Sequence, residues 1–315
     1  MDSKWERVIP YLDINIETAE KMMSVINPGE KIQKLSLIKK GLRNSNYRIE
    51  YDNKKFLIRI YGVNDDWWKK EKVVYNHVSE NIGVPKLYYL GEQFSIINKP
   101  YAIFEYIEGP TLDEYLQNEN YDKKVISEVG QNLALVHATS YNEVGFFEDS
   151  LVVTTKLPPL REWYDMFLAG NSERKLGTEL SDKVRKYIER NENNIKRIEE
   201  RITFVHNDFR PINILINNNK PYFIDWEGSM AGHALGDIGQ FLRINEQITE
   251  KTEKLFIDSY NNSTKNKLPE DYKELAKLRD LINPIQMLNS KHDLHNKDRD
   301  LINIVRATCT DEVAL

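Results

Sequence analysis

Residues 205–215 read Val205-His206-Asn207-Asp208-Phe209-Arg210-Pro211-Ile212-Asn213-Ile214-Leu215, and farther along the chain reads Tyr222-Phe223-Ile224-Asp225-Trp226-Glu227. Together they spell H-x-D-x-x-x-x-N, an apolar run, a polar turn, a second apolar run and an Asp. Phosphoryl transfer needs one group that accepts or orients the proton of the attacking hydroxyl, and two groups that hold magnesium against the nucleotide phosphates. Asp208 is the residue type for the first task, and Asn213 and Asp225 are the types for the second.

The spacing predicts a β-hairpin between these residues. Residues 214–216 and 222–224 have the composition of short strands. Residues 217–220 between them suit a turn, because Asn tolerates left-handed backbone angles. Antiparallel pairing then places Asn213, at the entry to the hairpin, beside Asp225 at its exit.

The loop that carries Asp208 lies just before the hairpin, and Pro211 keeps that loop from being helical. Three oxygen-bearing side chains therefore meet at the open end, where a hard cation such as Mg²⁺ finds the ligands it prefers. The plainer alternative is a surface hairpin that uses Asp and Asn only as turn residues.

Composition excludes several other classes of protein. The chain has 315 residues, 40% of them hydrophobic, which is enough for a large core in two lobes. A net charge of −5 gives no reason to expect nucleic acid or an anionic membrane as partner. Cys309 is the only cysteine, so the chain has no disulfide framework and a cytoplasmic location is expected. The N-terminus is too charged for a signal peptide, and no apolar run reaches membrane-spanning length.

The order of the predicted elements indicates an α+β fold of two lobes. The first part of the chain is expected to hold one or two helices within 4–27, strands at 32–38, 47–51, 55–60, 86–91 and 101–106, and a helix at 66–81. After the hairpin region at 203–225 is set aside, the rest is mostly helical, at 112–118, 122–139, 158–169, 179–200, 237–243, 249–261, 270–289 and 298–308. A small five-stranded antiparallel β lobe followed by a larger mainly helical lobe is the protein-kinase-like layout. We expect residues 1–107 to form the nucleotide-binding lobe, and residues 108–315 to carry the catalytic loop and an acceptor pocket.

The motifs resemble those of the aminoglycoside phosphotransferase and choline kinase superfamily more than those of protein kinases. The resemblance rests on His206-Asn207-Asp208 with Asn213, on Ile224-Asp225-Trp226-Glu227, on Gly236-Asp237-Ile238-Gly239, on Leu135-Val136-His137-Ala138 and on the two segments 41–47 and 103–109. It covers nearly the whole chain and implies a small-molecule kinase that uses ATP or GTP with Mg²⁺. We expect Asp237 to cap the helix that follows it and to anchor the catalytic loop.

The resemblance also implies a nucleotide site. The turn at 41–46 takes the place of a glycine-rich loop, so Asn44, Ser45 and Asn46 are expected to cover phosphates. If residues 104–108 form the hinge, Glu105 and Ile107 offer backbone groups to the nucleotide base.

Arg59 stands where kinases place a phosphate-binding Lys, in the apolar run Phe56-Leu57-Ile58-Arg59-Ile60. Arg is always charged and binds phosphate in a fork, so the replacement is workable. Glu71, on the following helix, is its expected partner. The alternative is an edge-strand Arg with a solvated Glu.

The acceptor is left open by the sequence. We favour an aminoglycoside-like or amino-sugar hydroxyl, and choline or another metabolite is the alternative. Five acids of the segment 240–308 are candidates for binding a cationic acceptor, Asp258, Asp271, Glu274, Asp280 and Asp293, although Lys and Arg are nearly as common there. A non-catalytic pseudokinase that binds nucleotide is the alternative of another class, and the presence of Asp208, Asn213 and Asp225 together argues against it.

Overall fold

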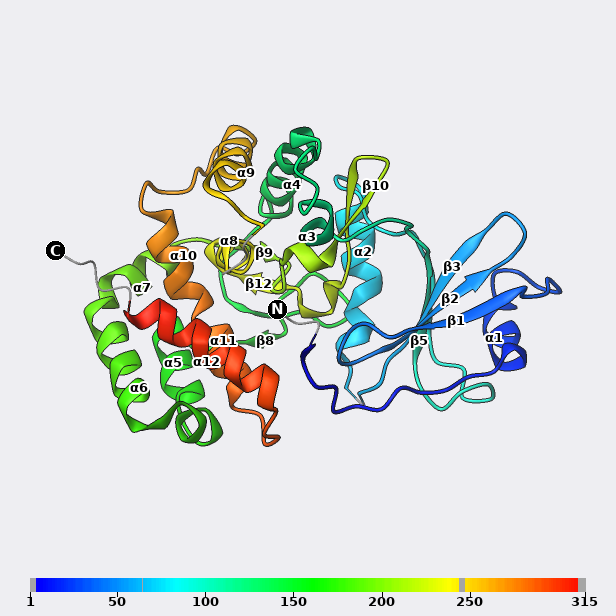
Figure 1. The fold of residues 1–315 in the computed structure, drawn as a ribbon, viewed down its shortest axis with the longest axis horizontal. Coiled ribbons are helices and arrows are strands. Elements are labelled where there is room, and N and C mark those ends of the chain that lie inside the picture. Colours follow the sequence, from blue (N-terminus) through cyan, green and yellow to red (C-terminus); the bar gives the residue numbers. More distant parts are fainter. Residues whose placement is uncertain (1–3, 64, 244–246, 311–315) are drawn as a thin grey trace.

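The computed structural model describes residues 4–63, 65–243 and 247–310, which fold into two lobes (Figure 1). The first lobe is built on an antiparallel sheet of five strands in the order β1-β2-β3-β5-β4. These are β1 (Lys34–Ile38), β2 (Ser45–Glu50), β3 (Lys55–Ile60), β4 (Leu87–Gly91) and β5 (Tyr101–Glu105). Helix α2 (Glu71–Ser79), preceded by a 3-10 turn at Trp67–Lys70, is inserted after β3. The expected sheet and inserted helix are therefore confirmed.

The two faces of this sheet pack against different partners. Side chains of one face, among them Tyr47 and Ile58, join Met22 of helix α1 (Ile16–Met23) in a core of the first lobe alone. The opposite face, with Phe104, packs on α2 in a core that continues into the second lobe. Arg59 and Phe104 are in contact on that second face, with the guanidinium carbon 5.4 Å from the ring centroid. The sheet therefore presents Arg59 toward the junction of the lobes.

The prediction that residues 4–27 form one or two helices is wrong for residues 5–15. Only Ile16–Met23 is helical, with Asn15 as the N-cap whose side chain accepts a hydrogen bond from the Thr18 N–H. Residues 5–15 run without helix along the first lobe (Figure 1). Pro10 blocks a helix through this stretch, because it lacks an N–H and restricts the residue before it.

The second lobe is mainly helical, as expected. Its helices are α3 (Leu112–Tyr115), α4 (Lys123–Val136), α5 (Leu160–Phe167), α6 (Asn171–Arg190), α7 (Glu192–Glu199), α8 (Ala234–Leu242), α9 (Glu250–Asn262), α10 (Tyr272–Asp280), α11 (Ile282–Leu288) and α12 (His295–Thr310). Two predicted helices are divided in the structure, 179–200 into parts of α6 and α7 and 270–289 into α10 and α11. No helix among the described residues has the length and apolar character needed to cross a bilayer.

A second sheet in this lobe has no counterpart in the sequence predictions. Its strands are β6 (Ser140–Tyr141), β7 (Gly145–Phe146), β8 (Thr155–Lys156), β9 (Ile202–Val205) and β12 (Met230–Gly232), in the order β6-β9-β12-β7-β8. Strands of two to four residues are too short to show a periodic pattern. The neighbours β9 and β12 lead into and out of the region that holds Asp208 and Asp225, so this sheet supports the candidate site.

The predicted hairpin is confirmed. Strands β10 (Ile214–Asn217) and β11 (Lys220–Phe223) pair antiparallel, with Ile214 opposite Phe223. Asn218 and Asn219 form the turn with φ of 49° and 57°. Positive φ at both central residues is typical of the hairpin turn that matches the twist of its strands.

Candidate active site

The loop that follows β9 is held by Asp237, in the first turn of α8. Its carboxylate accepts hydrogen bonds from the backbone N–H groups of His206 and Asn207, both at 2.8 Å, and from His137 Nε2 at 3.1 Å. Asn207 adopts left-handed backbone angles, with φ of 63°. The expectation that Asp237 anchors the loop is confirmed, whereas its expected role as helix cap is wrong, because His233 is the N-cap of α8.

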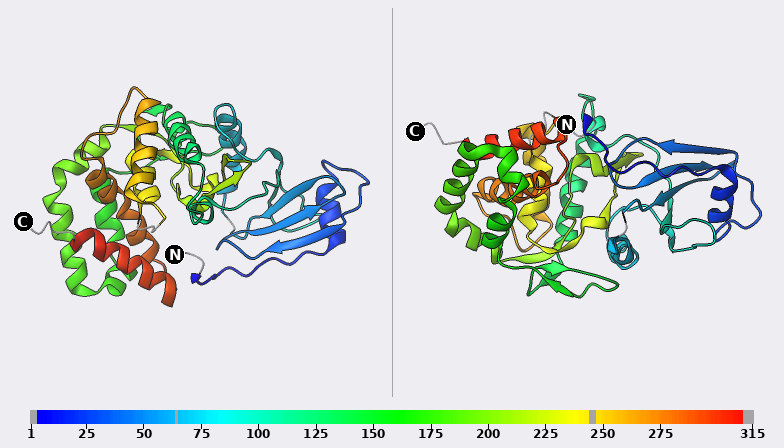
Figure 2. Two further views of the ribbon diagram at one scale, coloured as in Figure 1. Left: turned by 45° about the horizontal axis from the view of Figure 1, so that its top comes forward. Right: turned by 90° about the horizontal axis from the view of Figure 1, so that it is seen from below.

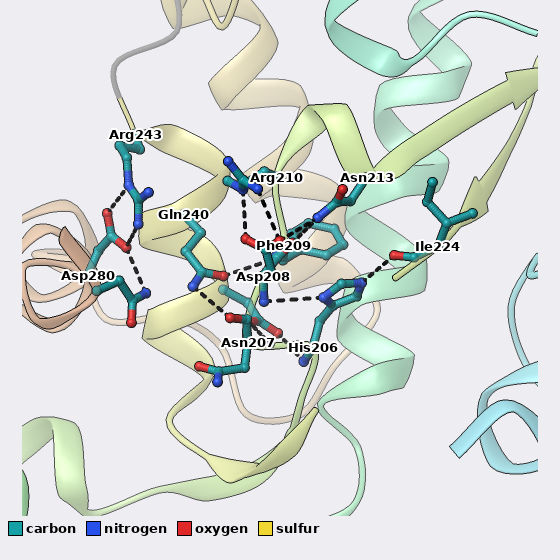
Figure 3. A network of polar contacts seen from close by, with 12 residues as sticks. His206, Asn207, Asp208, Phe209, Arg210, Asn213, Ile224, Gln240, Arg243 and Asp280 are labelled. Atoms are coloured by element: carbon teal, nitrogen blue, oxygen red, sulfur yellow. Dashed lines mark hydrogen bonds and ion pairs between the residues drawn. The ribbon is translucent and has the colours of Figure 1, made fainter. Parts of the chain in front are cut away.

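His206 organises the loop from inside. Its Nε2 donates to the Ile224 carbonyl at 3.0 Å, and its Nδ1 accepts from the Asp208 N–H at 3.3 Å (Figure 3). One neutral tautomer satisfies both bonds, and burial lowers the pKa of this histidine. The ring also packs on Trp226, with 4.4 Å between centroids. His206 thus ties the Asp208 loop to the residue just before Asp225.

Asp208 is oriented by two neighbours from its own loop. Asn213 Nδ2 donates to Asp208 Oδ2 at 2.8 Å and to the Asp208 carbonyl at 2.9 Å. Arg210 binds both carboxylate oxygens, Nε to Oδ1 at 2.7 Å and Nη2 to Oδ2 at 3.1 Å (Figure 3). Burial and the nearby charge of Asp225 raise the pKa of Asp208 to about 7. The result is a carboxylate in a fixed orientation, with Asn213 in direct contact.

The hairpin brings Asp225 to the same place. The Ile224 N–H donates to the Asn213 carbonyl at 3.0 Å, which closes the open end of the hairpin. Asp225 then turns out of the strand with φ of 69°, an uncommon conformation for a residue with a side chain. Its Oδ1 lies 3.4 Å from Arg59 Nη1 across the lobes. Asp208, Asn213 and Asp225 are therefore brought together, and Arg59 reaches them from the first lobe.

The donor set at this point suits Mg²⁺. The Asn213 amide nitrogen is turned to Asp208, which leaves its amide oxygen and the Asp225 carboxylate as hard oxygen donors of the type that Mg²⁺ prefers. Magnesium usually keeps waters and substrate phosphates for the rest of its shell. No group of three or more His, Cys, Asp or Glu in the described part of the chain forms a metal site by itself. A two-ligand site completed by phosphate fits these residues better than a protein-only site.

Arg59 and Glu71 are buried together. Arg59 Nη1 lies 3.8 Å from Glu71 Oε2, and the two side chains are 7% and 0% exposed. Burial raises the pKa of Glu71 to about 8, against the attraction of Arg59. Asn46 stands opposite Arg59 in the β2–β3 pairing, so the two share a face of the sheet. The alternative of a solvated edge pair is wrong.

The β1–β2 loop (residues 39–44) crosses toward the second lobe. Asn44 Nδ2 donates to Glu227 Oε2 at 3.0 Å, and Arg43 Nε lies 3.1 Å from Glu227 Oε1. Glu227 follows Asp225 closely, so the loop is attached beside the candidate metal site. Ser45 is oriented differently, because it is fully buried and its hydroxyl accepts a hydrogen bond from the Leu12 N–H at 2.9 Å. The Ser45 side chain is thus used within the fold, and the expectation that this residue helps to cover phosphates stays a prediction.

The expected hinge, residues 104–108, begins in the last two residues of β5 and continues beyond it. The Glu105 N–H donates to the Lys86 carbonyl at 2.8 Å, and its carboxylate accepts from the Lys86 N–H at 3.2 Å. Ile107 is buried. Both side chains and the Glu105 N–H are thus used within the fold, which leaves the Glu105 carbonyl and the Ile107 backbone as the groups expected to serve a nucleotide site.

Several polar residues of the site were not singled out from the sequence. Arg210 lies inside the motif, but nothing in the spacing indicates that it returns to Asp208. Gln240 of α8 accepts from the Phe209 N–H at 2.7 Å and donates to the Asn207 carbonyl at 3.0 Å (Figure 3). Arg243 Nε binds Asp280 Oδ2 at 2.7 Å, at the side of the loop away from the hairpin (Figure 3). The Gln240 and Arg243 contacts join residues more than 30 positions apart in sequence, so no local pattern reveals them.

Comparisons with known proteins agree with this geometry. A family model described as phosphotransferase enzyme family matches residues 34–278. A relative named Protein LicA homolog, from Metamycoplasma hominis, is 26% identical over 188 residues, which are 60% of this chain and 67% of that protein.

Two solved structures are similar in fold. A thermostable mutant of aminoglycoside phosphotransferase APH(4)-Ia, in ternary complex with AMP-PNP and hygromycin B, aligns with a TM-score of 0.68 and 16% identity over 95% of this chain and 99% of that chain. Choline kinase LicA from Streptococcus pneumoniae aligns with a TM-score of 0.66 and 17% identity over 93% of this chain and 98% of that chain. At these identities the likeness establishes the fold, which is protein-kinase-like.

Proposed function

Since the chain belongs to the phosphotransferase enzyme family, we propose that it transfers the γ-phosphoryl group of ATP or GTP to a hydroxyl of a small molecule, with choline-type amino alcohols as the first acceptor class. One observation carries the reaction type. Asp208, Asn213 and Asp225 converge at the open end of the hairpin, opposite Arg59 of the first lobe. Phosphoryl transfer depends mainly on positioning and charge stabilisation, and these are the groups it requires.

Each residue has a distinct task in this proposal. Asp208 accepts a hydrogen bond from the acceptor hydroxyl, orients it toward the γ-phosphorus and takes its proton as the bond forms. Asn213 and Asp225 hold Mg²⁺, which when bound neutralises charge on the phosphates. Arg59, held by Glu71, binds phosphate oxygens through its fork. The backbones of Glu105 and Ile107 hold the nucleotide base, and Asn44 and Asn46 lie over its phosphates.

Arg210 adds a step that the sequence motif does not contain. Its guanidinium donates to both oxygens of Asp208, and in this proposal it turns aside when an acceptor hydroxyl approaches. Beside Asp208, the Arg210 guanidinium then faces the phosphoryl group that is being transferred. Fixed donors at this place stabilise the negative charge that develops on the group.

The state of the acids in the second lobe supports our choice of acceptor class. Four of the five acids considered as sites for a cationic acceptor are already in ion pairs, Asp258 with Lys254, Asp271 with Arg197, Asp280 with Arg243 and Asp293 with Arg174. An aminoglycoside carries several cationic groups and would need several acids free of such partners. A choline-type acceptor has one positive charge. The relative named Protein LicA homolog and the structure of choline kinase LicA from Streptococcus pneumoniae favour the same class. Aminoglycosides are the second candidate, favoured by the fold relative bound to hygromycin B.

A coupled kinase assay tests the proposal. The purified protein is supplied with ATP or GTP, Mg²⁺ and a panel that contains choline, related amino alcohols and aminoglycosides, with Asp208→Ala as the blank. Turnover with choline-type acceptors alone supports the first candidate, and turnover with aminoglycosides alone selects the second. Nucleotide binding without turnover across a broad acceptor panel would indicate the pseudokinase alternative instead.

A further inference from the structure

The residues just before α1 form an extended segment that contacts both lobes. We name residues 5–12 the N-terminal strap. It starts beside the second lobe and runs along the edge of the first lobe to α1, dark blue in Figures 1 and 2. The left view of Figure 2 places its start close to the first turn of α12.

The strap is anchored on the second lobe by Trp5 and Glu6. The Trp5 side chain is 9% exposed and belongs to the core of that lobe, and its Nε1 donates to Asp300 Oδ2 at 3.0 Å. The Glu6 carboxylate accepts from the backbone N–H groups of Asn296 and Lys297, at 2.8 and 3.2 Å. These N–H groups lie in the first turn of α12, where a helix has no internal acceptors and favours an anion. They lower the pKa of Glu6.

Arg7, the next residue, holds the β1–β2 loop. Its Nη1 donates to the carbonyls of Gly41 at 2.9 Å and Asn44 at 3.1 Å, and its Nη2 donates to the Arg43 carbonyl at 3.3 Å. The guanidinium lies over the Tyr11 ring, 3.9 Å from its centroid. A single planar fork with five N–H donors therefore gathers three carbonyls of one loop.

The same loop is bound from its other side by Glu227, through the side chains of Arg43 and Asn44. Farther along the strap, the Leu12 N–H donates to the Ser45 hydroxyl at 2.9 Å, at the start of β2. The β1–β2 loop is thus held on one side by the strap, which Trp5 and Glu6 anchor to the second lobe. On its other side it is held by Glu227. Without Arg7, three carbonyls of the β1–β2 loop lose their charged donor. Gly41, at a φ of +83°, adds little rigidity to this loop.

We propose that Arg7 is a positioning residue for the β1–β2 loop, and that the strap couples the position of this loop to the closure of the two lobes. The proposal rests on the proposed function, in which this loop covers the nucleotide phosphates. If the lobes move apart, either the Glu6 contacts with α12 or the Arg7 contacts with the loop must break. Closed lobes and an ordered loop therefore stabilise each other, and nucleotide affinity depends on residues that do not contact the nucleotide.

Hydrogen exchange tests the hold on the loop without any nucleotide. Arg7→Ala should speed amide exchange in 41–46 by about tenfold, the size expected when a partly exposed charged donor is lost. Exchange in β9 and β12 should stay unchanged. Arg7→Lys should give an intermediate rate, because one ammonium cannot span three carbonyls. Arg197→Ala is the matched control, since it removes an Arg paired with Asp271 on the far part of the second lobe. Wild-type exchange in the loop of Arg7→Ala would overturn the proposal.

Nucleotide affinity tests the coupling. Calorimetry with Mg-ADP should show that Arg7→Ala weakens binding about tenfold and that Glu6→Gln weakens it less. The double variant should lose little more affinity than Arg7→Ala, because both residues act through one strap. Thermal unfolding confirms that the variants are folded. If the wild type binds no nucleotide, the proposed function fails. The hydrogen-exchange result still tests whether Arg7 holds the β1–β2 loop. If the wild type binds and Arg7→Ala binds equally well, or the double variant is fully additive, the coupling is refuted.

Discussion

The buried Glu71 carboxyl makes a sharp prediction about stability and pH. Glu71 is fully buried, and its nearest cation is Arg59 at 3.8 Å. Burial and the neighbouring acids Glu227 and Asp225 raise its pKa from 4.5 to about 8, although Arg59 opposes this. Replacing Glu71 by Gln keeps the shape of the side chain and removes its titration.

The sign follows from proton binding. Between about pH 4.5 and pH 8 the folded protein holds a proton on Glu71 that the unfolded chain has lost. The free energy of unfolding therefore falls as pH rises through this window. The contribution of the protonated Glu71 carboxyl is fully present only below the pKa that Glu71 has in the unfolded chain. At about 1.4 kcal/mol for each pKa unit, the full effect is roughly 5 kcal/mol. Water entry and small shifts of the chain reduce it, so we expect about 2 to 4 kcal/mol.

Urea unfolding at several pH values from 5 to 9, without nucleotide or magnesium, measures this contribution. Near pH 5 the wild type and Glu71→Gln should have similar free energies of unfolding, and toward pH 9 the variant should become the more stable of the two. Glu17→Gln, an exposed carboxylate that pairs with Lys21, is the control and should follow the wild type. A constant difference between wild type and Glu71→Gln across this range, or a wild type that gains stability relative to the variant as pH rises, would show that Glu71 is charged in the folded protein throughout and that the reasoning is wrong.

The remaining predictions concern catalysis and the loop. Asp208→Ala should lower kcat by about a hundredfold or more while nucleotide binding by calorimetry stays near wild type, because a positioned base is lost; near-normal turnover with a true acceptor would remove Asp208 from that role. Asp225→Asn should raise the Mg²⁺ needed for half-maximal ATP binding by about tenfold or more, and an unchanged magnesium titration would speak against metal ligation. At pH 9, where Glu71 is charged, Arg59→Met and Glu71→Gln should each weaken Mg-ATP binding, with a double variant that costs much less than the sum; additive losses would mean that the two do not act as a unit. Asp237→Ala should lower the free energy of unfolding by about 3 kcal/mol, because it leaves two buried N–H groups without an acceptor, and thermal unfolding at the wild-type temperature would contradict this.

Local signals carried most of the fold prediction. The strands at 55–60 and the hairpin at 214–223 are set by short apolar runs and by turn residues next to them, and these patterns are visible within a few positions. The helices of the second lobe follow from apolar periodicity in the same way, although their ends shifted where α10 and α11 divide. The N-terminal prediction failed at 5–15 because Pro10 interrupts any helix there and because Trp5 and Arg7 form tertiary contacts, which no periodic pattern reports.

The sequence by itself determined the candidate reacting groups of this protein: Asp208, Asn213 and Asp225 are picked out by their spacing, and the hairpin that brings them together is local. Only the tertiary structure decided their surroundings, including Arg210 on Asp208, Asp237 under the loop and the strap that holds the β1–β2 loop. Arg210 and Asp208 are only two positions apart, but no local pattern sets the direction of the Arg210 side chain; the other contacts join positions far apart in the chain, such as Glu6 and Asn296. Their energies arise from burial and from exact hydrogen-bond geometry, which exist only after the lobes have packed.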